Sequence, residues 1–275
     1  MRTRASWPDV ITDYRAYLAA AGRPATTIKL RVYQLRRFAE DHRGSPWKPT
    51  TQTIVNWLAG QHWSADTKKS YRSALVGFYR WARTMGHTTS DPTADLPAIT
   101  ALVHRPRPCP EIIYREALAR HAADPDVYLM LLLAGGQGLR RGEIAQIHSN
   151  DLFPDLIGHS LRVHGKGSKE RIVPLEPAIA ALLLDRGPGW AFPSPAPGRA
   201  GEHLTAGNVG VVIRRALPTG WSAHTLRHRF ATVAYARTRD LLAVQELMGH
   251  SRPETTRGYI LMPAEPLRAA VAAAA

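Results

Sequence analysis

The chain has 275 residues, of which 44% are hydrophobic and 21% charged, so it suits two ordinary domains and lacks the composition of a disordered protein. Its 36 lysines and arginines outnumber its 22 aspartates and glutamates, which gives a net charge of +14 and favours a polyanion such as nucleic acid. No apolar run approaches the roughly 20 residues of a membrane span, and MRTRASWPDV does not resemble a secretory signal. A single cysteine, Cys109, excludes internal disulfides and multi-thiolate metal sites. We therefore expect a cytosolic protein.

The first hundred residues carry the periodicity of helices. SWPDVITDYRAYLAAAG offers Ser6 as an N-cap and Gly22 past its end, and TIKLRVYQLRRFAEDH repeats apolar residues on one face. Further helices are expected over TQTIVNWLAG and DTKKSYRSALVGFYRWART. Basic residues recur here with few acids beside them, which favours phosphate contacts over a merely solvated face. The candidate DNA contacts in this half are Lys68, Lys69, Arg72 and Arg80.

A proline-rich stretch, DPTADLPAITALVHRPRPCP, separates this half from the rest. Proline at this density cannot continue a helix and favours an extended connector. We expect a helical DNA-binding domain over residues 1–96, a linker over 97–110 and a second domain over 111–275. Arg105 and Arg107 make the linker basic and join the candidate DNA contacts.

The second half mixes helices with a short β-hairpin. Helices expected over 112–123 and 125–137 precede GQGLRRGEIAQI. The runs SLRVH and RIVPL flank a turn rich in glycine and lysine, which is the pattern of a hairpin. Helical segments follow in AIAALLLD, NVGVVIRRAL, SAHTLRHRFAT and LLAVQELMGH. The sequence therefore predicts a mainly α fold with a small β-sheet.

Polar residues suited to holding a phosphate recur along this half. In SAHTLRHRFAT, His224, Arg227 and His228 are spaced three and four apart, so a helix would project them from one side. The others are Arg140 and Glu143 in GLRRGEI, Lys166 in HGKGSKER, His250 in LMGHS and Tyr259 in TTRGYI.

Taken in order, GLRRGEI, GKGSKERIVPL, HTLRHRFAT and LMGHSRPETTRGY resemble the boxes of the tyrosine recombinases, the phage-integrase type of site-specific DNA recombinase. Order and spacing agree across residues 135–260. The resemblance implies a helical core-binding (SAM-like) domain and an α+β catalytic domain of the fold shared with type IB topoisomerases. Because the first helix is expected near residue 8, we expect a minimal form without an arm-binding domain.

The resemblance also implies roles. The implied catalytic set is Arg140, Lys166, His224, Arg227, His250 and Tyr259, with Glu143 and His228 in support. Two guanidiniums suit the charge that develops on phosphate oxygens, while Tyr259 would attack and Lys166 would protonate the leaving 5′-oxygen. The 3′-phosphotyrosyl bond would keep the bond energy, so religation is expected to need no ATP, metal or other cofactor.

Other interpretations stay open. Arg140 and Glu143 could form only a structural ion pair, and Lys169 competes with Lys166 as the general acid. His224 and His228 resemble half a metal site, although no third ligand lies at a sensible spacing. For the whole protein, the rivals are a type IB topoisomerase and a catalytically inactive DNA-binding accessory protein.

The resemblance further implies partners. We expect a double-stranded DNA core site, a monomer in solution, a homotetramer on synapsed DNA and a directionality factor, in the nucleoid of a bacterial cytoplasm and without a membrane. The tail LRAAVAAAA, which begins at Leu267, is a helix former too short to be stable alone. We expect it to dock on a neighbouring subunit.

Overall fold

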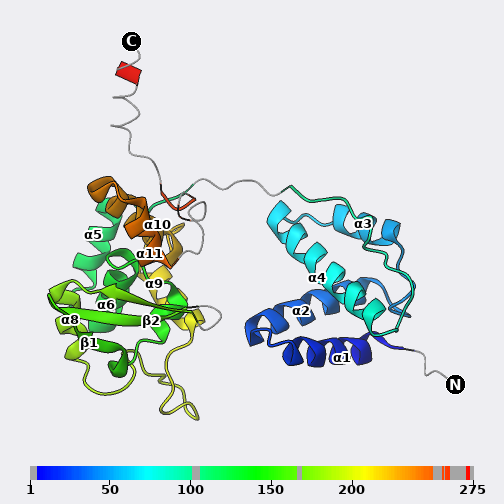
Figure 1. Ribbon diagram of the computed structural model, residues 1–275, viewed down its shortest axis with the longest axis horizontal. Coiled ribbons are helices and arrows are strands. Elements are labelled where there is room, and N and C mark those ends of the chain that lie inside the picture. Colours follow the sequence, from blue (N-terminus) through cyan, green and yellow to red (C-terminus); the bar gives the residue numbers. More distant parts are fainter. Residues whose placement is uncertain are drawn as a thin grey trace. The chain divides into compact units, whose positions relative to one another are not determined.

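The computed structural model describes residues 5–100, 106–165, 169–249, 256, 258–260 and 271–272. They divide between two compact units, Met1–Val103 and His104–Ala275 (Figure 1). Among the described helices, none is both long and apolar enough to cross a bilayer. The expected tail helix from Leu267 lies outside the described residues, apart from 271–272.

The first unit is helical throughout its described elements. These are α1 (Trp7–Ala20), α2 (Ala25–Asp41), α3 (Thr51–Ala59) and α4 (Ala65–Thr84). Ser6, Thr50 and Ser64 begin α1, α3 and α4, and each side-chain oxygen accepts a hydrogen bond from the backbone three residues on. The core between the helices is rich in aromatic rings; for example, the rings of Trp7 and Phe78 stack with centroids 5.6 Å apart.

The second unit is organised around a central helix. Its helices are α5 (Glu111–Arg120), α6 (Pro125–Gly135), α7 (Arg141–Ala145), α8 (Pro177–Leu184), α9 (Ala206–Ala216), α10 (Ala223–Thr238) and α11 (Leu241–Met248), with a 3-10 turn, η1 (Ser149–Asp151). The apolar helix α6 packs against α5, α7, α8, α9 and α10. This packing holds α7, α9 and α10, which carry the candidate site, against one core.

A small antiparallel sheet lies beside these helices. It consists of β1 (Leu152–Pro154), β2 (His159–His164) and β3 (Glu170–Pro174) in the order β1-β2-β3. Leu161 pairs with Val173, and both side chains are buried in the core. The expected hairpin is present, while β1 adds a strand that the sequence analysis did not predict. The mainly α fold with a small β-sheet is confirmed.

Candidate active site

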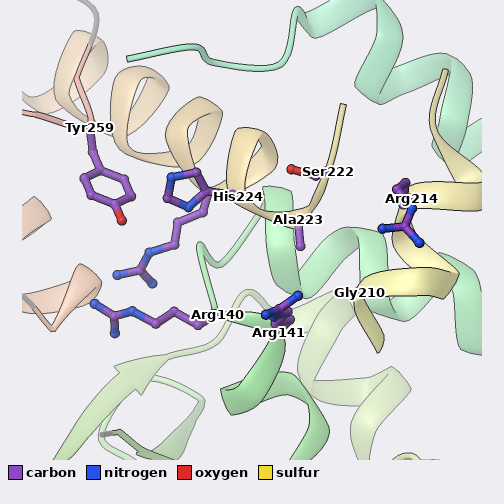
Figure 2. Close-up of a pocket in the computed structure, with 9 residues that line it drawn as sticks. Arg140, Arg141, Gly210, Arg214, Ser222, Ala223, His224 and Tyr259 are labelled. Atoms are coloured by element: carbon purple, nitrogen blue, oxygen red, sulfur yellow. The ribbon is translucent and has the colours of Figure 1, made fainter. Parts of the chain in front are cut away.

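One cavity of the second unit collects the polar residues of α7, α9 and α10. Its volume is about 440 Å³ (Figure 2). It is lined by Arg140, Arg141, Gly210, Arg214, Ser222, Ala223, His224, Arg227 and Tyr259. Four of these nine residues are arginines and none carries a carboxylate, so the described lining attracts an anion.

A glycine turn brings Arg140 to this cavity. Gly138, between α6 and α7, has a φ of +67°, and a Cβ there would collide with the ring of Phe230. Two residues later Arg140 is the N-cap of α7. The carboxylate of Glu143 accepts from the Arg140 backbone N–H at 2.8 Å and from Nη1 at 2.7 Å. The α7 start therefore fixes both the backbone and the guanidinium of Arg140.

Glu143 is the shared counter-ion of the site. Its side chain is only 4% exposed, and it accepts from Nη1 and Nη2 of Arg171 at 2.9 Å each, while Arg227 Nη1 lies 3.8 Å away. Burial alone would raise the pKa of this carboxyl, but the hydrogen bonds and charges of Arg171, the Arg140 backbone and Arg227 outweigh it and lower the pKa to about 2. Glu143 is therefore ionised at neutral pH and holds arginines from three elements together.

Arg227, on α10, is almost completely buried. Nη1 donates to the carbonyl of Gly138 and Nη2 to the carbonyl of Met248, at the end of α11. Burial, with Arg140 next, lowers the pKa of Arg227 to about 9, so the guanidinium remains charged at neutral pH. Two backbone carbonyls far apart in the sequence therefore fix the orientation of the Arg227 guanidinium.

Two histidines of α10 accompany Tyr259. The His228 ring stacks on the Tyr259 ring with centroids 4.3 Å apart, and the two Nε2 atoms of His224 and His228 are 3.0 Å apart. Burial lowers the pKa of both, with Arg227 contributing to each, and that of His228 falls to about 4. Both rings are therefore neutral at pH 7. In Figure 2 the Tyr259 hydroxyl points to the side of the cavity where the Arg140 guanidinium lies.

The structure does not describe every predicted site residue. Lys166, His250 and Arg105 lie outside the described residues. Lys169 is exposed, and its carbonyl accepts from Gly165 N–H at 2.7 Å across the base of the hairpin turn. In the part of the chain that the structure describes, no cluster of three or more His, Cys, Asp or Glu is arranged to hold a metal ion.

The candidate DNA contacts differ in their surroundings. Lys69 and Arg80 are exposed on α4 and Lys68 is half-buried. Arg72 donates from Nε to the Pro97 carbonyl at 2.9 Å and from Nη2 to the Leu96 carbonyl at 2.8 Å. Arg72 therefore holds the chain after α4 against that helix. The guanidinium of Arg107 lies 4.6 Å from the centroid of the Trp221 ring.

Sequence reasoning missed Arg171, the bidentate partner of Glu143. A signal was present in the sequence. Residues two apart on a strand share a face, so Arg171 lies on the same face of β3 as the buried Val173. An arginine on the core face of a strand needs a buried anion, but its partner is 28 residues away. Arg141 and Arg214 were also missed, since single arginines on helices are typical of solvated faces.

Known proteins resemble this chain in sequence and in fold. The model of the phage integrase family matches residues 114–263. Tyrosine recombinase XerD of Rhizobium meliloti is 31% identical over 233 residues, which cover 76% of this chain and 74% of XerD. Tyrosine recombinase XerC of Rhodospirillum centenum is 30% identical over 277 residues, covering 89% and 80% of the two chains.

A solved structure supports the fold independently. A lambda integrase tetramer bound to a Holliday junction has a TM-score of 0.73 at 20% identity, covering 93% of this chain and 78% of that one. The chain belongs to the phage integrase family, the tyrosine recombinases. It is accordingly a site-specific recombinase.

Proposed function

We propose that this chain cuts and rejoins DNA at a short core site through a 3′-phosphotyrosyl intermediate and a Holliday junction. The observation that carries the proposal is the cavity lined by the hydroxyl-bearing ring of Tyr259 and the guanidiniums of Arg140 and Arg227, without a lining carboxylate. A tyrosine beside two fixed cations is suited to attack on a phosphodiester, whose negative charge needs compensation before an anionic nucleophile can approach.

The two arginines would hold the non-bridging oxygens of the scissile phosphate. Arg140 is fixed by Glu143, and Arg227 by the Gly138 and Met248 carbonyls, so little reorganisation is needed when charge develops. One such preorganised donor contributes on the order of 10²–10³ in rate. His224, neutral at pH 7, can donate a hydrogen bond to the same phosphate without adding charge.

In the proposed step, the Tyr259 hydroxyl gives up its proton to solvent, its oxygen forms a bond to phosphorus, and the bond from phosphorus to the 5′-oxygen breaks. The leaving oxygen takes a proton, which the family resemblance assigns to Lys166, and His250 completes the set. Religation reverses the step when the 5′-hydroxyl of another strand attacks. The bond energy is retained, so this exchange consumes no nucleotide.

The proposal includes assembly. Lambda integrase, whose fold is similar, occurs as a tetramer on a Holliday junction, and this supports a homotetramer of the present chain on synapsed DNA. A monomer when free is part of the same proposal. A directionality factor as partner belongs to the same proposal, as does residence with the nucleoid in a bacterial cytoplasm.

Covalent trapping tests the nucleophile. A half-site duplex is selected for binding from a random library and then nicked, so that the 5′-hydroxyl fragment is lost after cleavage. The wild-type chain should give a slowly migrating adduct in a denaturing gel. Tyr259→Phe should give none and bind DNA as the wild type does, because the hydroxyl attacks phosphorus but contributes little affinity.

Tyr235→Phe is the matched control, since Tyr235 also lies on the α10–α11 side of the unit but does not line the cavity. This variant should form the adduct normally. An adduct with Tyr259→Phe would contradict the assignment. With two full sites, Holliday junctions should accumulate; cleavage without junctions would favour the topoisomerase interpretation.

A further inference from the structure

The cavity contains more positive charge than one phosphate requires. Beyond Arg140 and Arg227, its lining includes Arg141 on α7 and Arg214 on α9. Both side chains are exposed, and among the described residues neither takes part in a hydrogen bond or an ion pair. By contrast, Arg140 and Arg227 are both bound to the Glu143 network or to backbone carbonyls. A second anion at this end of the cavity would satisfy the two remaining guanidiniums.

The backbone geometry of α7 and α9 brings the side chains of Arg141 and Arg214 to the same cavity lining. Arg140 is the N-cap of α7 and Arg141 the first helical residue, so their side chains diverge, Arg140 toward Tyr259 and Arg141 toward α9 (Figure 2). A Cβ at Gly210 would lie 3.2 Å from Arg141 Cδ and 3.3 Å from its Nη1. Glycine therefore lets Arg141 lie close against α9. Arg214 follows Gly210 by one helical turn, on the same side of α9.

The first turn of α10 borders the same end. Ser222 is its N-cap and Ala223 its first residue, and both line the cavity. The positive end of a helix dipole adds to the attraction of an anion there. In Figure 2, Arg214 and Tyr259 mark opposite ends of the lining, with Arg141 between them and the Arg140 guanidinium on the Tyr259 side.

We propose that Arg141 and Arg214 bind the phosphate next to the scissile one, so that the cavity holds two consecutive phosphates of one DNA strand. This inference rests on the proposed function, because it assumes that Arg140 and Arg227 hold the scissile phosphate. Binding two neighbouring phosphates fixes the direction in which the strand crosses the cavity, which a contact to one phosphate alone does not. Because phosphates repeat at every nucleotide, the second contact orients the scissile phosphate toward Tyr259 and does not choose which phosphate is cut.

Neutral methylphosphonates, placed one position at a time on either strand of the suicide half-site, test this subsite. In the wild type, neutralising the phosphate adjacent to the scissile one should weaken binding about tenfold, the effect of losing one charge-assisted hydrogen bond. The double variant Arg141→Ala/Arg214→Ala should bind unmodified DNA about tenfold more weakly. Its log–log salt slope should be shallower by about 0.9 for the lost phosphate contact.

The decisive result is the coupling between protein and DNA changes. In the double variant, the methylphosphonate at the adjacent position should cause no further loss, while methylphosphonates elsewhere retain their effects. A full methylphosphonate effect in the double variant, or coupling to the opposite strand, would overturn the proposal.

Two further variants separate position from charge. Arg215→Ala removes a neighbouring exposed charge from the same last turn of α9, but Arg215 does not line the cavity, so its methylphosphonate profile should match the wild type. Gly210→Ala keeps both arginines and displaces Arg141, and it should weaken binding only on DNA whose adjacent phosphate is charged. If the wild type formed no adduct, the proposed function would be refuted. The binding measurements would still show whether Arg141 and Arg214 bind the adjacent phosphate.

Discussion

At the scale of single residues, Glu143 determines how the site is held together. Arg140, Arg171 and Arg227 come from α7, β3 and α10, and their charges would repel one another without it. A buried charge that loses its partner is strongly destabilising, whereas the intact network is fully hydrogen-bonded on the carboxylate. The ion pair of Arg140 and Glu143, considered from the sequence as a structural alternative to catalysis, is present, and Arg140 also lines the cavity with Arg227 and Tyr259.

The stability that Glu143 contributes should depend on pH. Its pKa falls from 4.5 to about 2, which corresponds to about 3 kcal/mol at pH 7. Because the folded-state pKa is lowered, this stabilisation is complete above about pH 4.5 and is lost as the pH falls toward 2. Glu143→Gln should therefore lose about 3 kcal/mol of unfolding free energy at pH 7 and progressively less below pH 4.5. Urea unfolding at several pH values measures the difference.

Glu40→Gln is the control for this comparison. Glu40 pairs with Arg37 at 3.2 Å, but its side chain is 64% exposed. Solvent screens such a pair, and its removal should change the free energy of unfolding by less than about 1 kcal/mol at any pH. Equal losses in the two variants would show that burial of the Glu143 network does not contribute as described.

At the scale of secondary-structure elements, the base of the β2–β3 hairpin has its own ionic clamp. His164 Nε2 lies 2.8 Å from Asp151 Oδ1, and Nδ1 lies 3.1 Å from Glu170 Oε1. The hydrogen bond to Asp151 raises the pKa of His164 above 6.5, and Glu170 adds to it, although partial burial opposes the shift. The clamp joins η1 and β3 at the end of β2.

The stability that His164 contributes depends on pH in the opposite direction to that of Glu143. Because the pKa of His164 is raised in the folded state, the stabilisation is present below about pH 6.5 and is lost as the pH rises through the folded-state value. His164→Gln should therefore lower the melting temperature at pH 6 and have a smaller effect at pH 8.5. Calorimetry measures this, with the exposed His62→Gln as a control that should show neither effect. If His164→Gln lowered the melting temperature by the same amount at pH 6 and at pH 8.5, the clamp would be contradicted.

The same elements indicate how far sequence reasoning reaches. Local signals predicted the N-cap at Ser6, the glycine just past the end of α1 at Gly22 and the pairing of the two strands of the hairpin, since each depends on neighbouring residues alone. Strand β1 was missed because LFP is only three residues long and ends in a proline, which lacks a backbone donor. The Arg171–Glu143 pair joins residues 28 positions apart, so only the folded chain brings them together. The motif boxes predicted Arg140, His224, Arg227 and Tyr259 as a group, and these four line one cavity.

At the scale of the whole molecule, the two units divide near the proline-rich segment, Met1–Val103 and His104–Ala275. Each has its own hydrophobic core, and all residues that line the described cavity belong to the second unit. Exposed Lys69 and Arg80 leave α4 of the first unit available to phosphates. We therefore expect both units to contact DNA, with the linker predicted over 97–110 between them.

Protease should cut the free protein within residues 97–110, and bound DNA should protect that segment. A fragment beginning at residue 106 should bind the half-site more weakly than the full chain. Its salt dependence should also be shallower, by about 0.9 in log–log slope for each phosphate contact that is lost. Titrations at several salt concentrations provide the comparison. Equal slopes for fragment and full chain would contradict DNA contacts by the first unit.

The last turn of α11 is held in place by two arginines of the site. The carbonyls of Leu247 and Met248 accept hydrogen bonds from Arg171 and Arg227, so α11 cannot swing away without leaving both guanidiniums poorly satisfied. Each such bond contributes about 1.5–3 kcal/mol. Withdrawal of the proposed nucleophile, Tyr259, is therefore expected to cost least beyond Met248, at Gly249, whose φ of +58° already suits a chain reversal. Under the proposed function, a subunit whose Tyr259 had withdrawn would keep Arg171 and Arg227 in place, so that its arginines would not have to be reassembled before the next cleavage.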